Sequence, residues 1–199
     1  MSKDWIGNAN SIFKIISASN HTDGDRADND YYATEPKATQ LLLDNEKFSD
    51  TVWEPACGGG YMAEVLKKNG YRVIATDLIY RGYGVEKSFD FLEETFDNFN
   101  GDIVTNPPYN KALQFVQRAL DNVKTGHKVA MFLKLTFLEG KSRKQFFLDN
   151  PPKIVYVSSS RLICAKNGDF ESINGSAVAY AWFVWEKGFS GDPIIKWIN

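Results

Sequence analysis

The residue types that would grip a planar amine occur together in one tetrapeptide, Asn106-Pro107-Pro108-Tyr109. The two prolines fix the backbone and lack N–H donors, so their carbonyls remain as acceptors. Asn106 adds a side-chain acceptor, and Tyr109 offers an aromatic face on which a ring can stack. Two acceptors on one NH₂ group draw its nitrogen toward tetrahedral geometry and free its lone pair. Asn106 would therefore orient and polarise an amine rather than act as a strong base.

A glycine-rich segment further upstream, 54–60 (EPACGGG), joins an expected strand to an expected helix. Its glycines permit positive φ and let a ligand approach the backbone closely. The segment has neither the Gly-Lys-Ser/Thr ending of a phosphate-binding loop nor the third glycine of the dinucleotide fingerprint, so its ligand need not carry phosphate. Glu54 suits a cationic group such as an ammonium. Taken alone, the segment also fits a tight turn with no ligand, in which Cys57 is a small residue rather than a nucleophile.

Two acidic positions further along the chain extend this candidate site. Asp77 ends the next expected strand, and a carboxylate there can accept two hydrogen bonds from ribose hydroxyls. The pair Asp90-Phe91 adds a ring that can pack on an adenine. Each position taken singly also fits a helix cap, a turn or the core, so the prediction depends on their occurring together.

Alternating strands and helices position these motifs. Helices are expected over 34–43, 61–69, 112–123 and 137–148, and strands over 51–54, 71–76, 103–105, 129–135, 154–157 and 177–185. Thr34 is expected to cap the first helix, with Pro36 in its first turn. The alternation predicts an α/β fold with a mostly parallel sheet and helices on both faces, ending in an antiparallel strand pair at one edge. Ligands of such sheets bind at the carboxyl ends of the strands, where these motifs fall.

The composition fits one globular domain. The 199 residues are 43% apolar and 24% charged, which excludes collagen-like, disordered and coiled-coil chains. No apolar run approaches the ~18 residues of a membrane span and the N-terminus has no leader pattern, so we expect a cytoplasmic protein with no membrane partner. Two cysteines support neither a disulfide framework nor a zinc site, and no metal is expected. The polar stretch 17–30, which includes His21, predicts an N-terminal arm over 1–30.

Together these motifs resemble those of the amino-methylating DNA methyltransferases that use S-adenosylmethionine. The segment 31–36 (YYATEP) resembles the motif that those enzymes place before the glycine loop. The stretch 18–21 (ASNH) and the expected closing strand 180–186 (YAWFVWE) resemble the short adenine-N6 methyltransferases of phages and prophages. The resemblance spans nearly the whole chain, and Asn106–Tyr109 is its most specific part. It implies a Rossmann-like class I methyltransferase fold with a seven-stranded sheet, and a single catalytic domain over 31–199.

The resemblance also implies roles for individual residues. The residues implied to hold the cofactor are Thr34, Glu54, Pro55, Ala56, Cys57, Gly58 and Gly60 at its methionine end, Asp77 at its ribose, and Leu78, Asp90 and Phe91 at its adenine. Asn106 and the Pro107 carbonyl would hold the N6 amine of an adenine flipped out of duplex DNA, with Pro108 completing the motif and Tyr109 stacking on the base. Methyl transfer would be an in-line displacement driven largely by positioning.

Two departures from the family pattern concern the acceptor. Related enzymes often supply a second aromatic side chain around the segment 160–164, which here reads SRLIC. The base is therefore expected to be held on one face only, or against an aliphatic side chain. Larger relatives carry a separate target-recognition domain, for which this chain has no room, so sequence discrimination is expected to be loop-based and short, or weak.

Basic side chains concentrate in one part of a chain whose net charge is only −2: residues 111–166 carry 11 basic and 3 acidic side chains. This distribution fits a surface for a polyanion, and it also fits a set of solvated helix faces. The candidates for contacting DNA phosphates are Lys111, Lys141, Arg143, Lys144 and Arg161.

Three alternatives remain open. RNA adenine and the glutamine amide of a protein present the same planar amine, and Asn-Pro-Pro-Tyr also occurs in the methyltransferases that act on them. The segment 31–36 and the closing strand favour DNA over both. The third alternative is a catalytically inert module that binds S-adenosylmethionine and DNA without turnover.

Overall fold

The computed structural model describes residues 31–94, 98–171, 176 and 178–199. The predicted N-terminal arm over 1–30, with its polar stretch and His21, lies outside these residues. The helices and strands are β1 (Tyr32–Thr34), α2 (Pro36–Asn45), β2 (Thr51–Glu54), α3 (Tyr61–Lys68), β3 (Arg72–Ala75), β4 (Asp102–Thr105), α4 (Ala112–Asn122), β5 (Lys128–Lys134), α5 (Lys144–Asp149), β6 (Ile154–Ser158), β7 (Cys164–Lys166), β8 (Tyr180–Glu186) and β9 (Ile194–Ile198). Short 3₁₀ turns occupy Tyr109–Lys111, Leu135–Leu138 and Lys141–Arg143. Among the described residues, no helix is long and apolar enough to cross a membrane.

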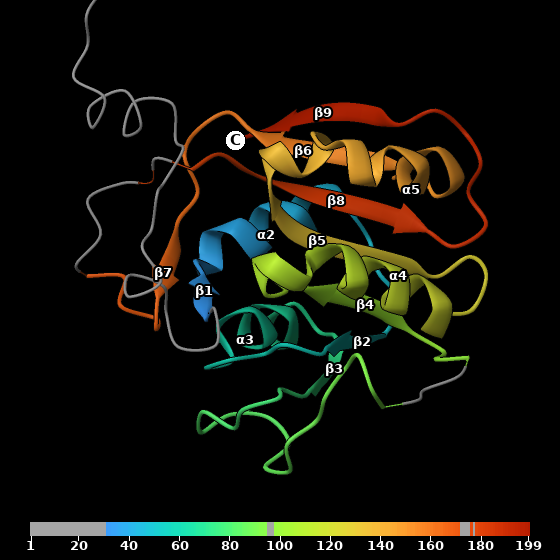
Figure 1. The fold of residues 1–199 in the computed structure, drawn as a ribbon. Coiled ribbons are helices and arrows are strands. Elements are labelled where there is room, and N and C mark those ends of the chain that lie inside the picture. The colour runs from blue at the N-terminus through green and yellow to red at the C-terminus, as the bar shows by residue number, and fades with distance from the viewer. Residues whose placement is uncertain (1–30, 95–97, 172–175, 177) are drawn as a thin grey trace, which may run out of the picture.

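Seven strands form one sheet in the order β3-β2-β4-β5-β8-β6-β9, and β1 pairs with β7 in a separate two-stranded sheet (Figure 1). The strands from β3 to β5 pair in parallel, whereas β8 is antiparallel to both β5 and β6. The mostly parallel seven-stranded sheet is confirmed, and so is the antiparallel pair of β6 and β8 toward one edge. The rim itself is β9, a strand absent from the sequence-based prediction, which pairs in parallel with β6. The strand of opposite direction therefore lies inside the sheet, with its backbone groups paired on both sides.

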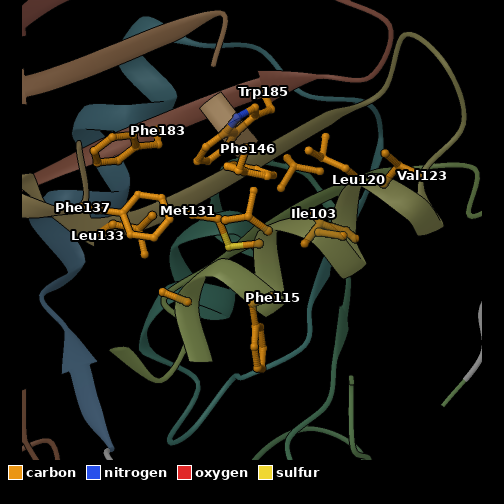
Figure 2. Packing of buried hydrophobic residues seen from close by; sticks show 14 of the residues in the cluster. Ile103, Phe115, Leu120, Val123, Met131, Leu133, Phe137, Phe146, Phe183 and Trp185 are labelled. Atoms are coloured by element: carbon orange, nitrogen blue, oxygen red, sulfur yellow. The ribbon is translucent and has the colours of Figure 1, made fainter. Parts of the chain in front are cut away.

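Helices cover both faces of the sheet, as predicted. On one face α4 and α5 pack on strands β4, β5 and β8, and Figure 2 shows Phe146 of α5 beside Trp185 of β8 within this cluster. On the other face α2 and α3 bury Leu42 and Leu66 against the sheet. The indole N–H of Trp182 in β8 donates to the Ala38 carbonyl of α2 at 2.8 Å, which ties the helix to the middle of the sheet.

The first helix begins differently from the prediction. Thr34 does not cap it but lies in β1, where it pairs with Cys164 of β7. Glu35 occupies the cap position without a side-chain capping bond, and its Oε1 instead accepts a hydrogen bond from the Ile163 N–H at 2.6 Å. The predicted cap is wrong because pairing between β1 and β7 fixes the residues before the helix.

The helix predicted over 137–148 is broken into two 3₁₀ turns and the shorter helix α5. Gly140 interrupts it with a φ of 135°. The Arg143 guanidinium donates to the carbonyls of Thr136, Phe137 and Glu139. These carbonyls would accept backbone hydrogen bonds in a continuous helix, so the Arg143 side chain stabilises the broken form instead.

Asp102 joins three segments at the amino ends of the strands. It is 3% exposed, and its carboxylate accepts hydrogen bonds from Ser49 N at 2.6 Å, Lys128 N at 2.8 Å and His127 Nδ1 at 2.9 Å. We expect Asp102→Ala to lower the free energy of unfolding by about 3 kcal/mol, because two backbone N–H groups lose their acceptor. Urea denaturation would measure the loss, and Asp102→Asn, which keeps one acceptor oxygen, should lose less. A loss below about 0.5 kcal/mol, as for an ordinary surface substitution, would contradict the expectation.

Candidate active site

A cavity of about 370 Å³ opens at the carboxyl ends of β2, β3 and β4. It brings together the motifs that the sequence analysis singled out from separate parts of the chain. All of the predicted cofactor-binding residues line it except Gly58 and Gly60, and so do Asn106, Pro107, Pro108, Tyr109 and Lys111. Tyr31 and all three residues of β1 form another part of the lining, so the short β1–β7 sheet borders the cavity.

The glycine loop reaches this cavity through Pro55, Ala56 and Cys57, and the glycines after them have no room for a side chain. Gly58 has a φ of 51°, and a Cβ built there would lie 2.1 Å from the Tyr31 ring. Gly60, at the cap position of α3, has a φ of 83°, and a Cβ there would lie 2.4 Å from the Tyr83 ring. A side chain at either position would require these rings to move, in addition to the strain of positive φ. Although neither glycine is in the lining, both set the path of the loop.

Glu54 brings a buried carboxylate to the cavity. The residue is 2% exposed, and its Oε2 has no hydrogen-bond partner among the described residues. Burial raises the pKa of Glu54 well above its ordinary value of 4.5, against the opposing effect of a backbone hydrogen bond from Ala63. A buried acceptor of this kind suits a cationic ligand group, which would bring the charge and the donor that the protein does not supply.

The raised pKa of Glu54 gives a pH-dependent cost to folding. The folded state holds the Glu54 proton more tightly than the unfolded state. The contribution of Glu54 to the free energy of unfolding is therefore favourable below the ordinary pKa of 4.5 and is lost as pH rises through the raised pKa. We expect Glu54→Gln to remove this loss and to stabilise the unliganded protein by about 1–2 kcal/mol at pH 8 but not at pH 4. Thermal melts of both proteins across this range would measure it, and a pH-independent difference would contradict it.

Asp77 follows β3 and binds the glycine loop to the segment after it. Its Oδ2 accepts from Gly58 N at 2.8 Å, and its Oδ1 accepts from Ile79 N at 2.9 Å and from the Arg81 guanidinium at 3.1 Å. Arg81 also lies over the Tyr31 ring, 4.5 Å from its centroid. A carboxylate has about four acceptor positions, so the three donors on Asp77 leave room for one further hydroxyl. The second hydroxyl of a diol would have to compete with Arg81 for Asp77.

The proposed adenine-binding residues lie at one side of the cavity. Leu78 is 46% exposed, whereas Phe91 is 2% exposed. The Phe91 ring packs at 5.1 Å from both the Trp53 and Phe115 rings, so it serves the core as well as the cavity lining. Asp90 Oδ1 accepts a hydrogen bond from Leu92 N at 2.9 Å, which shapes the turn that carries Phe91.

Asn106 is held in one orientation at the end of β4. Its Nδ2 donates to the Tyr32 carbonyl at 2.8 Å and lies 3.8 Å from Cys164 Sγ. Its Oδ1 is buried and has no hydrogen-bond partner among the described residues. The amide is therefore fixed with its donor side toward β1 and β7 and its acceptor left for a ligand.

Tyr109 has aromatic neighbours on several elements. Its ring centroid is 5.7 Å from that of Tyr32 and 6.0 Å from that of Tyr180, whose hydroxyl lies 3.1 Å from the Tyr109 hydroxyl. Burial raises the pKa of Tyr109 well above its ordinary value, so the phenol stays neutral. Tyr32 and Tyr180 thus provide aromatic side chains near the Asn106–Tyr109 motif, whereas the segment 160–164 contains no aromatic residue.

Neither thiol is suited to nucleophilic chemistry. Burial raises the pKa of Cys57 to about 12, and it also raises the pKa of Cys164 to about 12. A thiol with such a pKa holds almost no thiolate at neutral pH. Within the described residues, moreover, no group of three or more His, Cys, Asp or Glu side chains is placed to hold a metal ion.

The basic residues predicted to contact phosphate are placed unequally. Lys141, Lys144 and Arg161 are exposed, and Lys111 is exposed at the rim of the cavity. Arg143 differs, because its guanidinium is committed to three backbone carbonyls and lies 5.0 Å from the Phe137 ring centroid. The structure gives Arg143 a role in the shape of this loop, and a phosphate contact by it would cost these bonds.

Several residues of the site escaped the sequence-based prediction. Tyr31 and Tyr32 belong to the segment 31–36, whose resemblance indicated a motif but assigned a role only to Thr34. Arg81 gives no signal in sequence beyond its spacing of four residues from Asp77. Cys164 reaches Asn106 only because β7 pairs with β1, and a pairing between such distant short strands has no local signature.

Some of the solved structures with a similar fold are described as methyltransferases, whereas others, from Streptococcus thermophilus and Lactococcus lactis, are provisionally described as hemolysins. The M protein of the Type I restriction enzyme EcoKI is 15% identical with a TM-score of 0.56, and the match covers 81% of this chain but only 45% of that one. A Listeria monocytogenes protein, provisionally described as a class I S-adenosylmethionine-dependent methyltransferase, is 12% identical with a TM-score of 0.53 over 94% of this chain and 70% of that one. A protein from Pyrococcus horikoshii, provisionally described as an RNA methyltransferase, is 13% identical with a TM-score of 0.51 over 77% of this chain and 84% of that one.

No protein-family model matches the sequence, and the search of curated proteins finds no match. The likeness to solved structures, at these identities, concerns the fold. The chain has the Rossmann-like class I methyltransferase fold that its sequence predicts.

Proposed function

We propose that the protein transfers a methyl group from S-adenosylmethionine to the N6 amine of adenine in DNA. The observation that carries this proposal is the orientation of Asn106. Its Nδ2 is bound to the Tyr32 carbonyl, and its buried Oδ1 has no partner among the described residues. A buried acceptor without a donor costs about 1–3 kcal/mol. An exocyclic amine entering the cavity would supply the missing donor at the atom where the family pattern expects it.

The other half of the cavity fits S-adenosylmethionine. Glu54 Oε2 is a buried acceptor without a partner among the described residues, which suits the ammonium of the methionine end. The glycine loop, whose bare backbone has no room for Cβ atoms, would follow the same part of the cofactor. Ribose hydroxyls would take the place of Arg81 on Asp77, and Leu78, Asp90 and Phe91 would contact the adenine.

When bound, S-adenosylmethionine supplies an electrophilic methyl group on a sulfonium with a neutral thioether as leaving group. The protein's own contribution is to position the amine for in-line attack. Asn106 Oδ1 and the Pro107 carbonyl would each accept one N–H of the amine, which frees the nitrogen lone pair from the ring. The lone pair forms the new N–C bond as the C–S bond breaks, and the methylated nitrogen then loses one proton to solvent. Tyr109 would stack on the base, and its neutral phenol adds no charge to the site. An adenine in duplex DNA must first leave the helix, at a cost of a few kcal/mol.

Adenine in DNA is proposed over the other planar amines for two reasons. The segment 31–36 lies at the cavity, where Tyr31, Tyr32, Ala33 and Thr34 line it, and this is the motif whose resemblance favours DNA. The closing strand β8, the second element with that resemblance, provides Tyr180 beside Tyr109. Adenine in RNA and a protein glutamine amide are tested beside it.

The test is a mass-spectrometric assay of modified nucleosides. The purified protein is incubated with S-adenosylmethionine and unmethylated duplex DNA, with RNA, or with a glutamine-containing peptide, and Asn106→Ala serves as the control. N6-methyladenine in DNA that depends on Asn106 is the expected result. Methylation of RNA or peptide alone would move the acceptor to that class. Binding of cofactor and DNA without any product would indicate an inert module.

A further inference from the structure

Tyr109 lies between two cavities that differ in charge. The first cavity is lined by the acidic side chains of Glu54, Asp77 and Asp90 as well as by Lys111 and by Arg81, which is paired with Asp77. A second cavity of about 120 Å³ shares Tyr109 as a wall, and none of the described acidic side chains lines it. Its apolar lining includes Leu133 and Phe137, seen together in Figure 2, and its cations are Lys134 and Arg143. The charges of the second cavity are therefore positive, and they favour a negatively charged group there.

Lys134 is the cation in this second cavity whose N–H donors are not bound to backbone carbonyls among the described residues. It ends β5, is half-buried, and places its Nζ 4.5 Å from the centroid of the Tyr109 ring. In the described part of the chain, no carboxylate lies within 4.0 Å of this nitrogen. The neighbouring Arg143 guanidinium, in contrast, is bound to backbone carbonyls. Partial burial of an ammonium without an anion is unfavourable, so Lys134 is poised for an anionic ligand.

We propose that the second cavity binds a backbone phosphate next to the target nucleotide, with Lys134 Nζ as its contact. The proposal rests on the proposed function, because it takes Tyr109 as the ring on which the target base stacks. A nucleotide whose base lies against Tyr109 carries its phosphates a short way from that ring, and Lys134 lies over the same ring. Lys111 lines the first cavity, so a strand passing Tyr109 would meet one lysine on each side. A substrate that places a phosphodiester in this cavity must be a nucleic acid, so the site would distinguish a nucleotide from a protein glutamine.

The test compares Lys134→Met, which keeps the length and packing of the side chain, with Lys134→Arg and with Lys47→Met. Lys47 is exposed and precedes β2, at the amino ends of the parallel strands, whereas Lys134 is the last residue of β5. Binding of an unmethylated, adenine-containing DNA duplex and of the same sequence as RNA is measured over a range of salt concentrations. We expect Lys134→Met to weaken binding about tenfold and to flatten the slope of log K against log salt by about 0.9. Lys134→Arg should keep the slope, and Lys47→Met should match the wild type.

A purely structural Lys134 would give a different pattern. If its contact with the Tyr109 ring served only stability, Lys134→Met would lower the melting temperature and leave the salt slope unchanged, which would overturn the proposal. Wild-type protein that binds neither nucleic acid would overturn it as well. A slope that depends on Lys134 without any methylated product would leave the phosphate site standing and would reject the proposed function. Methylated product together with a salt slope that does not depend on Lys134 would support the proposed function and reject the phosphate site. The DNA and RNA arms identify which phosphodiester backbone the site prefers.

Discussion

Asn106→Ala is expected to reduce kcat for methyl transfer to adenine about 10³-fold while leaving the Kd for S-adenosylmethionine unchanged. The substitution removes the acceptor that would polarise the amine, and one positioned polar group at a reacting centre typically contributes 10²–10³-fold, about 3–4 kcal/mol. Cofactor affinity should not change, because the cofactor contacts are proposed for Glu54, Asp77 and the glycine loop and not for Asn106. Single-turnover methyl transfer measures the first quantity, and isothermal titration calorimetry the second.

Asn106→Asp provides the matched control. The aspartate keeps an acceptor oxygen but cannot donate to the Tyr32 carbonyl, which now accepts from Asn106 Nδ2 at 2.8 Å. We expect activity between those of the wild type and Asn106→Ala, because the acceptor remains and its orientation is lost. A raised KM with unchanged kcat in Asn106→Ala would show that Asn106 only binds the acceptor. Wild-type kinetics in Asn106→Ala would reject its role altogether.

Asp77→Ala is expected to weaken S-adenosylmethionine binding about 10²–10³-fold, since two hydrogen bonds from ribose hydroxyls to a charged acceptor are lost. Asp77 also holds Gly58 N at 2.8 Å, so the loop itself would be less well ordered. Asp77→Asn keeps one acceptor oxygen and should lose less affinity. Calorimetric titration measures each Kd.

Arg81→Met gives the opposite expectation at the same carboxylate. This substitution removes the donor that competes with a ribose hydroxyl for Asp77, and it should leave the Kd unchanged or lower it. If Asp77→Ala bound the cofactor as tightly as the wild type while its melting temperature fell, Asp77 would be a loop-stabilising residue and not a ribose ligand.

Local sequence patterns predicted most of the elements that carry the site. The strand over 51–54 and the glycines after it fix the place of Glu54, and the apolar run 103–105 followed by two prolines fixes that of Asn106. The carboxyl ends of parallel strands meet at one edge of a sheet, so the prediction that these strands are parallel was enough to gather Glu54, Asp77 and Asn106 around one cavity.

Features that depend on distant partners were not predictable in this way. Thr34 has the composition of a helix cap, yet pairing with β7 places it in a strand. The helix expected over 137–148 has suitable residues, but its carbonyls are bound by the Arg143 side chain. Tyr32 and Lys134 gain their importance from neighbours far along the chain, and no pattern within their own segments indicates those neighbours.

The position of β8 inside the sheet has a consequence for the order of folding during synthesis. β5 ends at residue 134, but its neighbour on one side is residues 180–186, which leave the ribosome later. Until then β5 has an unpaired edge, and β6 lacks the strand that joins it to the rest of the sheet. Non-local pairing of this kind is slow to form. We therefore expect a nascent chain that ends before residue 180 to remain sensitive to proteolysis even though its glycine loop and Asn-Pro-Pro-Tyr motif are complete, and protection to begin only when β8 can insert.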